Sequence, residues 1–440
     1  MKQKIMLFVG LFLALSQITA CSSEPGNDIS TTDGTETAHN SSVATGTESV
    51  TPEQTSAVLL SPLKPYAQTE EWDGEILLAI SAYSDVLLSE EDKQVYPALA
   101  DTLEQKNAML VRSMEDEFDN LLSTAKEELS LLGADSFVTK KSTADTQIRR
   151  ADSVVVSILS DSYLVYGNIS DRGLFGTTYD TESGRELAIT DVIRDMSRIP
   201  AIVKEELQSH TWAGEFLSDT AVEDYFRDTP ADGLSWTLDN NGVTFYFGNC
   251  DVAEIGPGGR LAATVSFAEY PDLFEAKYTA VPDAYMTEIS PDHPFYVNID
   301  NDAALEELYV TPFTDDSNLY YASFGIYIDA DAVFYEFSAD AASAIGGYHP
   351  YYVKTQDNRH YLYVFADSSE LAPGAMKLRV IDITGGTCKE VGDMHIGPGY
   401  IPVDCTYALT DPDNMILENF ETREESAAYR VGDNGMPVRK

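Results

Sequence analysis

The chain has 440 residues, and its 28 Lys and Arg against 73 Asp and Glu give a formal net charge of −45. This balance excludes nucleic acid and anionic membrane surfaces as partners bound through charge, because such binding needs clustered basic residues and the sequence has none. The acidic excess would attract a cationic partner, although ordinary solubility also explains it and is the favoured interpretation. Hydrophobic residues make up 43% of the chain, enough for about two or three cores of ordinary size.

The first 20 residues predict export from the cell. Residues 1–20 contain two lysines, an apolar run from Ile5 to Leu15 and small residues at the end, which are the parts of a signal peptide. The run is too short to span a bilayer about 30 Å thick. Ile18-Thr19-Ala20-Cys21 resembles the lipobox of bacterial lipoproteins. We therefore predict that Cys21 carries a lipid that anchors the chain to the extracytoplasmic face of a bacterial cell membrane. The alternative is an ordinary signal peptide and a chance cysteine.

A tether and two folded domains are expected after the signal. Residues 21–58 are rich in Ser, Thr and Gly and almost lack large apolar residues, so they cannot bury enough surface to offset the entropy of ordering. We interpret them as a disordered tether. The composition then divides the remaining chain into residues 66–280 and residues 281–440, where Tyr, Asp and alternating apolar residues become frequent.

Residues 66–280 predict an α+β fold. Apolar residues recur at helical spacing from Leu99 to Leu132, with Pro97 in the first turn and Gly133 after the last, which predicts one long amphipathic helix. Two shorter helices are expected to open at Pro200 and at Thr220, where Thr220 and Glu223 have capping-box spacing. Strands are predicted at residues 154–158, 163–166, 173–179, 186–189, 236–238, 243–247 and 261–267, and Asp239-Asn240-Asn241-Gly242 predicts a hairpin turn. We expect an antiparallel sheet packed with these helices.

Residues 281–440 predict a mostly antiparallel β domain. Short runs of alternating apolar residues are separated by turn residues, a pattern typical of a sandwich or of part of a propeller. The predicted strands are residues 320–328, 332–337, 348–353, 360–365 and 376–383.

An ordered set of motifs in residues 72–274 carries a resemblance to a known family. Val95-Tyr96-Pro97-Ala98-Leu99 opens the long helix, and a Tyr-Asp turn follows within residues 178–187. The hairpin of residues 238–247 and the segment 251–259 continue the set. In this order the motifs resemble the extracytoplasmic domain of the RsiV-like anti-sigma factors, which receives lysozyme. The resemblance implies binding of a cationic protein rather than catalysis.

Two features limit what this resemblance implies. Relatives often carry Gly-Gly-Ala-His after the second strand, whereas this chain reads Gly-Asn-Ile-Ser-Asp-Arg-Gly over residues 167–173, so no role of that histidine transfers. A lipid-anchored chain without a membrane helix also cannot transmit a signal to the cytoplasm as an anti-sigma factor does. We therefore expect only the ligand-receiving part of that function.

One segment resembles a degenerate calcium loop. Its alternating oxygen-bearing residues would supply the ligands of a hard cation. Ala303 stands where such a loop has glycine, so a polar turn without metal is the favoured alternative. If Ca²⁺ binds, the expected ligands are Asn298, Asp300, Asp302 and Glu306; no other cofactor is expected.

An aromatic cluster in the β domain is a second candidate site. Tyrosines on alternating strand positions would offer apolar area with a polar tip to a sugar ring or a protein partner. Packing between neighbouring strands is the favoured alternative. The cluster consists of Tyr348, His349, Tyr351, Tyr352, Tyr361 and Tyr363. His349 and His360 would face each other with Asp357 in a less favoured arrangement.

The remaining cysteines and the absence of catalytic motifs complete the prediction. Cys388 and Cys405 flank a Gly-rich reversal and would form a disulfide, which leaves Cys250 alone. The sequence lacks the motifs of zinc proteases, serine hydrolases and P-loop enzymes, so no catalytic residue is assigned. We expect an envelope binding or sensing lipoprotein whose partner is a cationic protein such as lysozyme or a cell-wall component. The alternatives are an envelope hydrolase acting on wall glycan or peptide, and a spacer or assembly module.

Overall fold

The structure is a computed structural model that describes residues 55–61, 64–74, 76–166, 169–209, 217, 220–248, 251–252, 261–289, 294–300, 302, 304–315, 320–329, 333–343, 348–367, 376–396, 408–418 and 426–440. All of these residues belong to one compact unit, Glu53–Lys440. The signal peptide, Cys21 and most of the tether lie outside the described residues, so they stay predictions. Over the described ranges, no helix has the length and hydrophobicity needed to cross a membrane.

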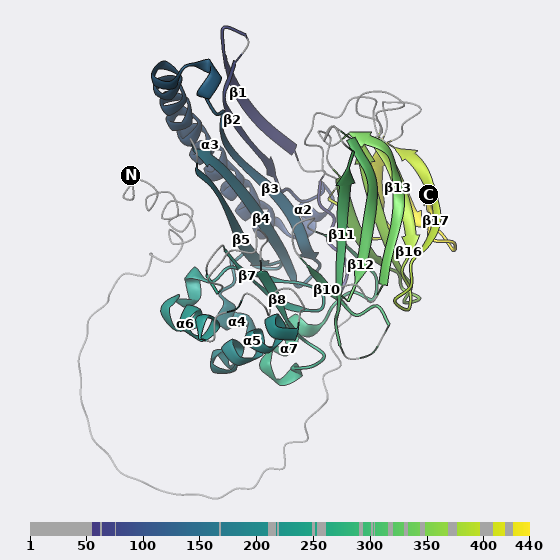
Figure 1. The fold of residues 1–440 in the computed structure, drawn as a ribbon. Coiled ribbons are helices and arrows are strands. Elements are labelled where there is room, and N and C mark those ends of the chain that lie inside the picture. The colour runs from purple at the N-terminus through teal and green to yellow at the C-terminus, as the bar shows by residue number, and fades with distance from the viewer. Residues whose placement is uncertain are drawn as a thin grey trace, which may run out of the picture. The chain divides into compact units, whose positions relative to one another are not determined.

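The first part of the described chain is a five-stranded sheet with a long helix packed against it (Figure 1). Its elements are β1 (Lys64–Trp72), β2 (Ile76–Asp85), α2 (Asp92–Val95), α3 (Pro97–Leu132), η2 (Ala134–Ser136), β3 (Lys140–Ala151), β4 (Val155–Tyr166) and β5 (Ile169–Asp180). Neighbouring strands pair in chain order, and all pairs are antiparallel except β2 with β3. That pair is parallel because α3 provides the crossover between them.

A three-stranded sheet and several short helices share the next core. The elements are α4 (Ile189–Val192), η3 (Met196–Arg198), α5 (Ile199–Ser209), α6 (Ala221–Asp228), η4 (Ala231–Gly233), β6 (Trp236–Leu238), β7 (Gly242–Phe247), β8 (Leu261–Ser266), η5 (Pro271–Leu273) and α7 (Ala276–Thr279). Helices α5 and α6 place Val203 and Val222 against Phe245 and Phe247 of the sheet. Removing this apolar surface from water stabilises the unit.

The β domain contains three antiparallel sheets among the described residues. Their strands are β9 (Tyr285–Glu288), β10 (Phe295–Val297), β11 (Glu306–Thr314), β12 (Tyr320–Ile328), β13 (Val333–Ser343), β14 (Tyr348–Lys354), β15 (His360–Asp367), β16 (Met376–Asp382), β17 (Lys389–Ile396), β18 (Met415–Glu418), β19 (Ser426–Val431) and β20 (Pro437–Arg439). The central sheet has the order β17-β16-β15-β14-β9. It shares one core with β10–β13 and another with β18–β20, so both of its faces are covered.

The two parts of the unit meet where β3 contacts β9. The hydroxyl of Thr287 on β9 donates to the Arg149 carbonyl of β3 at 3.4 Å. The short segment of residues 55–60 also lies at this junction: Ala57 bridges Asp152, and the Val58 carbonyl accepts a bond from the Thr410 hydroxyl at 2.8 Å.

The predicted fold class is confirmed. An α+β part with a long helix is followed by a mostly antiparallel β domain. The long helix spans Pro97–Leu132, and Gly133 follows it with a φ of 73°, a conformation that suits glycine. The hairpin at residues 239–242 is also confirmed by the pairing of β6 with β7. The boundary at residues 280 and 281 stays a prediction.

Several element predictions were wrong in detail. Residues 155–166 form one strand rather than two, because β3 and β5 pair with β4 on both sides across the predicted turn. Glu186 makes only a single bridge to Tyr179, and a helix begins at Ile189 because the Asp191 carboxylate accepts from the Ala188 N–H. Thr220 precedes α6 as expected, but its hydroxyl donates to Asp224 instead of forming a capping box.

Candidate functional site

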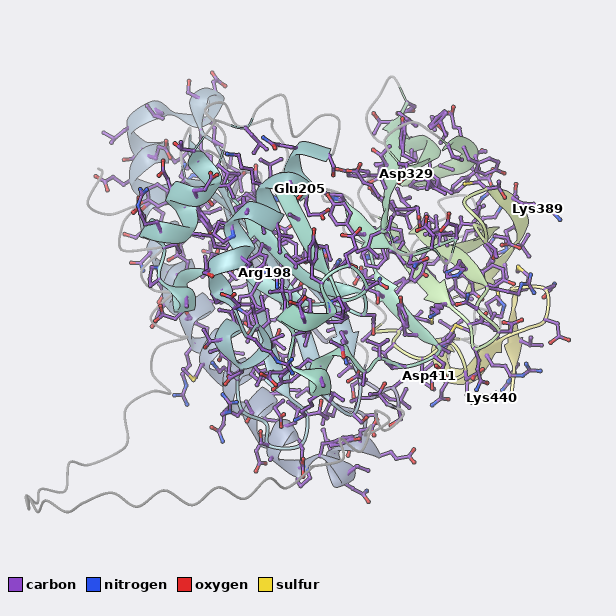
Figure 2. All side chains as sticks on the ribbon, turned by 90° about the horizontal axis from the view of Figure 1, so that it is seen from below. Arg198, Glu205, Asp329, Lys389, Asp411 and Lys440 are labelled. Carbon is purple, nitrogen blue, oxygen red and sulfur yellow. The ribbon has the colours of Figure 1, made fainter. Side chains whose placement is uncertain are left out.

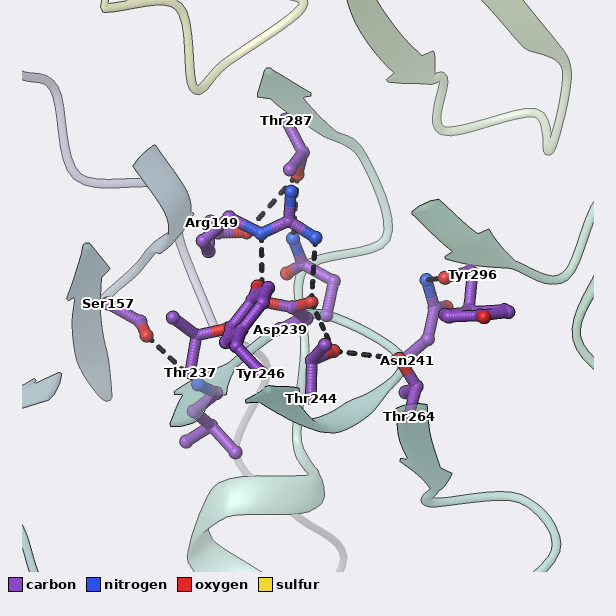
Figure 3. Close-up of polar contacts among 12 residues, drawn as sticks. Arg149, Ser157, Thr237, Asp239, Asn241, Thr244, Tyr246, Thr264, Thr287 and Tyr296 are labelled. Carbon is purple, nitrogen blue, oxygen red and sulfur yellow. Dashed lines mark hydrogen bonds and ion pairs between the residues drawn. The ribbon is translucent and has the colours of Figure 1, made fainter. Parts of the chain in front are cut away.

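A buried ion pair fixes β3 at the junction of the two parts (Figure 3). Arg149 is 2% exposed, and its guanidinium donates to both oxygens of Asp239, from Nε at 3.2 Å and from Nη2 at 2.9 Å. The hydroxyls of Thr237 and Thr244 donate to the same carboxylate at 2.9 and 2.7 Å. A buried charge pair stabilises a structure only when its hydrogen-bonding positions are filled, and here each oxygen of Asp239 accepts two bonds.

The same arginine connects the pair to the β domain. Its Nη1 donates to the Glu288 carbonyl at the end of β9, at 3.4 Å. Asn241 in the neighbouring hairpin donates to the carbonyl of Tyr296 at 3.3 Å, and the Tyr296 hydroxyl donates back to Ala262 at 3.2 Å. These contacts hold β3, the hairpin β6–β7 and the strands β9 and β10 in a fixed arrangement.

Three titratable side chains converge at this junction, and we call Asp145, Glu288 and His349 the junction cluster. His349 Nδ1 lies 3.1 Å from Glu288 Oε1, with side chains 21% and 6% exposed. Asp145 lies on β3, four residues before Arg149. It is close enough to influence the titration of both partners.

Burial and mutual charge shift the titration of all three groups. Burial raises the pKa of Glu288 to about 7, against the opposing effect of His349. Burial acts to lower the pKa of His349, but its hydrogen bond to Glu288 and the charges of both carboxylates raise it above the usual value. Asp145 itself is exposed. The surrounding protein nevertheless displaces enough water to raise the pKa of Asp145.

The junction cluster can therefore exchange protons near neutral pH or receive a cation. Glu288 is bonded to the imidazole and Asp145 influences its titration, and a raised carboxyl pKa means that the surroundings favour the neutral form over the anion. A positively charged group placed between Asp145 and Glu288 would reverse this preference. Shifted groups of this kind are characteristic of functional sites, although structural pairs also produce them.

The structure places the predicted aromatic cluster in two separate cores. Its five tyrosines are each at most 8% exposed. Tyr348 and Tyr352 enter the core shared with β10–β13, while the other three enter the core shared with β18–β20. The six predicted residues form no common exposed face, and cross-strand packing accounts for the tyrosines. His349 and His360 do not face each other, because His349 pairs with Phe365 and His360 with Lys354 across β14 and β15. His360 Nδ1 is bonded to the Tyr352 hydroxyl at 2.5 Å.

The predicted calcium loop brings three carboxylates together. Ligand oxygens of Asp300, Asp302 and Glu306 lie within 4.8 Å of one another. Asp300 and Asp302 each accept a backbone N–H, at 3.0 and 2.8 Å, and the Asn298 amide donates to the Asp302 carbonyl. These bonds account for a polar turn, so calcium stays a prediction. A rise of the melting temperature in calcium would support it, and an indifferent melting temperature would refute it.

The cysteine predictions fall largely outside the described residues. Cys21, Cys250 and Cys405 are not among them, so the lipid anchor and the disulfide stay predictions. Cys388 precedes β17 and is partly buried, and this burial raises the pKa of its thiol to about 11.

The sequence analysis missed Asp145 and Glu288. Glu288 ends the buried run Tyr285–Glu288, and a carboxylate in such a run is a signal that could have identified it. Asp145 lies in a polar strand that shows no apolar alternation, and nothing in the sequence connects it to His349.

Comparison with solved structures finds weak likenesses. No protein-family model and no curated protein matches the chain. A crystal structure of a DUF3298 family member from Bacteroides fragilis aligns with a TM-score of 0.37 and 12% identity, covering 51% of this chain and 96% of that chain. A DUF3298 family protein from Pseudomonas aeruginosa aligns with a TM-score of 0.31 and 14% identity, covering 50% of this chain and 97% of that chain.

Proposed function

We propose that this protein is an extracytoplasmic, lipid-anchored binding or sensing protein whose ligand is a cationic protein. The observation that carries the proposal is the junction cluster, where Glu288 is bonded to the imidazole of His349 and the carboxylate of Asp145 lies close enough to influence both. A lysine or arginine side chain of a partner would supply the missing positive charge. The net charge of −45 supports the same conclusion, because it accelerates encounter with cationic proteins.

The proposal gives binding a defined dependence on pH. A bound cation favours the ionised carboxylates and the neutral imidazole, so binding releases protons from the junction cluster. Affinity should therefore increase as the pH rises from about 6 to about 8. It should also weaken as salt is added, because salt screens charge attraction.

Hen lysozyme is the probe for this proposal. We expect saturable binding to the purified chain at physiological salt, and weaker binding to Asp145→Asn and Glu288→Gln. Asp116→Asn is the matched control, because it removes one exposed carboxylate from α3 without touching the junction cluster. Absence of binding, or an equal effect of all three substitutions, would refute the assignment.

An envelope hydrolase is the second candidate, and one observation favours it. A carboxyl group with a pKa of about 7 beside a histidine is suited to general acid–base catalysis. Incubation with peptidoglycan fragments distinguishes the two functions. Fragments consumed with turnover, and spared by Glu288→Gln, would favour the hydrolase. If the chain forms a concentration-dependent dimer and binds no ligand, the alternative function of a spacer or assembly module would be favoured.

A further inference from the structure

The β domain contains a cleft of about 330 Å³ that the junction cluster does not include. It lies where the turn between β14 and β15 meets the segments that flank β18 and β19. Three aspartates line it, Asp357, Asp413 and Asp433, and the side chains of all three are exposed. Tyr361 and Arg359 also line it.

Tyr361 contributes a buried hydroxyl that lacks a hydrogen-bond partner among the described residues. The residue is 1% exposed and points to the face of β15 on which the cleft lies, since it shares a core with Val431. The ring is held between neighbours: the Arg359 guanidinium lies 5.1 Å from its centre, and a Cβ at Gly435 would lie 2.4 Å from a ring atom. Buried polar groups are nearly always satisfied, so this hydroxyl requires a partner.

The charges around the cleft favour a cation as that partner. Arg359 is engaged by the protein, because Nη1 donates to the Asp433 carbonyl at 2.5 Å and Nη2 to Asp382 at 3.5 Å. Lys440 lies beside Asp411 (Figure 2) and donates to Asn414 at 3.4 Å. The lining therefore carries three carboxylates against one guanidinium.

We propose that this cleft binds a small ligand through a primary ammonium group. The Tyr361 hydroxyl oxygen accepts a hydrogen bond from the ammonium, and the rim carboxylates of Asp413 and Asp433 balance its charge. Burial raises the pKa of Tyr361 to about 12, so the phenol stays neutral at physiological pH. The ammonium belongs either to a free amine or to the lysine side chain of a peptide.

Calorimetry with the purified chain tests the proposal. The probes are 1,4-diaminobutane for a free amine, Nα-acetyl-lysine amide for a peptide side chain, and glucose as a neutral hydroxylated compound. We expect saturable binding of at least one amine and none of glucose. Binding of the lysine amide alone would identify the peptide source, and binding of the diamine alone would identify the free amine.

Tyr361→Phe is the decisive variant. It should weaken amine binding at least tenfold without lowering the melting temperature, because the lost hydroxyl has no partner in the described structure. Asp433→Asn should also weaken binding. Tyr320→Phe is the control, since Tyr320 is 40% exposed on another sheet. Failure of both amines to bind, or unchanged binding to Tyr361→Phe, would overturn the proposal.

The result is separable from the lysozyme test. Glu288→Gln alters the junction cluster and leaves every lining residue of the cleft in place, so it should bind amines normally. Conversely, Tyr361→Phe should bind lysozyme as the unaltered chain does. Loss of both activities in either variant would contradict the assignment of two independent sites.

Discussion

The carbonyl oxygen of Trp236 in β6 lies directly against the backbone of Gly176 in β5. A Cβ at residue 176 would lie 1.7 Å from that oxygen, far inside van der Waals contact. Gly176→Ala must therefore push β6 away from β5, and we expect a loss of about 3 kcal/mol or more of unfolding free energy in urea titrations. Gly392→Ala is the control, because its nearest atom is the Met436 sulfur at 3.4 Å. Equal losses in both variants would contradict this account.

The ion pair of Arg149 and Asp239 provides a second prediction. Asp239→Asn leaves the guanidinium buried without its counter-charge, and we expect a loss of about 3–5 kcal/mol of unfolding free energy. Asp228→Asn disrupts a comparable contact with Arg227, but these side chains are 67% and 63% exposed. That substitution should change stability by less than about 1 kcal/mol. Denaturant titration of both variants measures the difference, and a small loss in Asp239→Asn would argue against a buried pair.

The junction cluster should make stability depend on pH. The pKa of Glu288 is raised to about 7 in the folded chain, so the folded state holds a proton that the unfolded state loses at lower pH. Its contribution is fully present at acidic pH and is lost as the pH rises through about 7. His349, with a raised pKa, acts in the same direction.

Glu288→Gln isolates this effect. Between pH 5 and pH 8 the unaltered chain should lose on the order of 1–3 kcal/mol more stability than the variant. Subtracting the stability loss of the variant from that of the unaltered chain removes the general effect of the acidic surface, which both proteins share. Parallel pH profiles would show that Glu288 does not titrate in this range.

Glu117 is a second buried carboxyl group, on the inner face of α3. Its residue is 8% exposed, and burial alone raises its pKa to about 7. At pH 8 the group must be ionised in a poorly hydrated position, so Glu117→Gln should raise the thermal midpoint there. At pH 5 the neutral acid and the amide should be nearly equivalent. Asp116→Asn, which alters the exposed residue next to Glu117, is the control. Its effect on the thermal midpoint should not differ in sign or size between pH 5 and pH 8.

The long helix α3 could be predicted from sequence because its information is local. One apolar stripe from Leu99 to Leu132, a proline at the start and a glycine at the end define it without reference to other elements. The strand β3 could not be predicted in this way. Its polar residues are satisfied by distant partners, as Arg149 is by Asp239, and the strand therefore lacks the alternation of a half-buried sheet.

The candidate site has the same difficulty. His349 was recognised as a member of an aromatic cluster and as a partner of His360, but not with its actual neighbours, because neither Glu288 nor Asp145 lies near it in sequence. The tyrosines around it suggested a half-buried sheet. The sequence did not indicate that β18–β20 cover the second face of this sheet. Because both faces are buried, the tyrosines lie in two cores and not on a binding surface.

The segment of residues 55–60 has a mechanical consequence. It bridges Asp152 beside the five-stranded sheet, Leu88 after β2, and Thr410 of the β domain. Tension applied to the chain ahead of residue 55 would therefore load three sites at once instead of unzipping a terminal strand residue by residue. The protein should resist pulling from that end up to a single rupture force, which an optical-trap pulling experiment on the purified chain would measure.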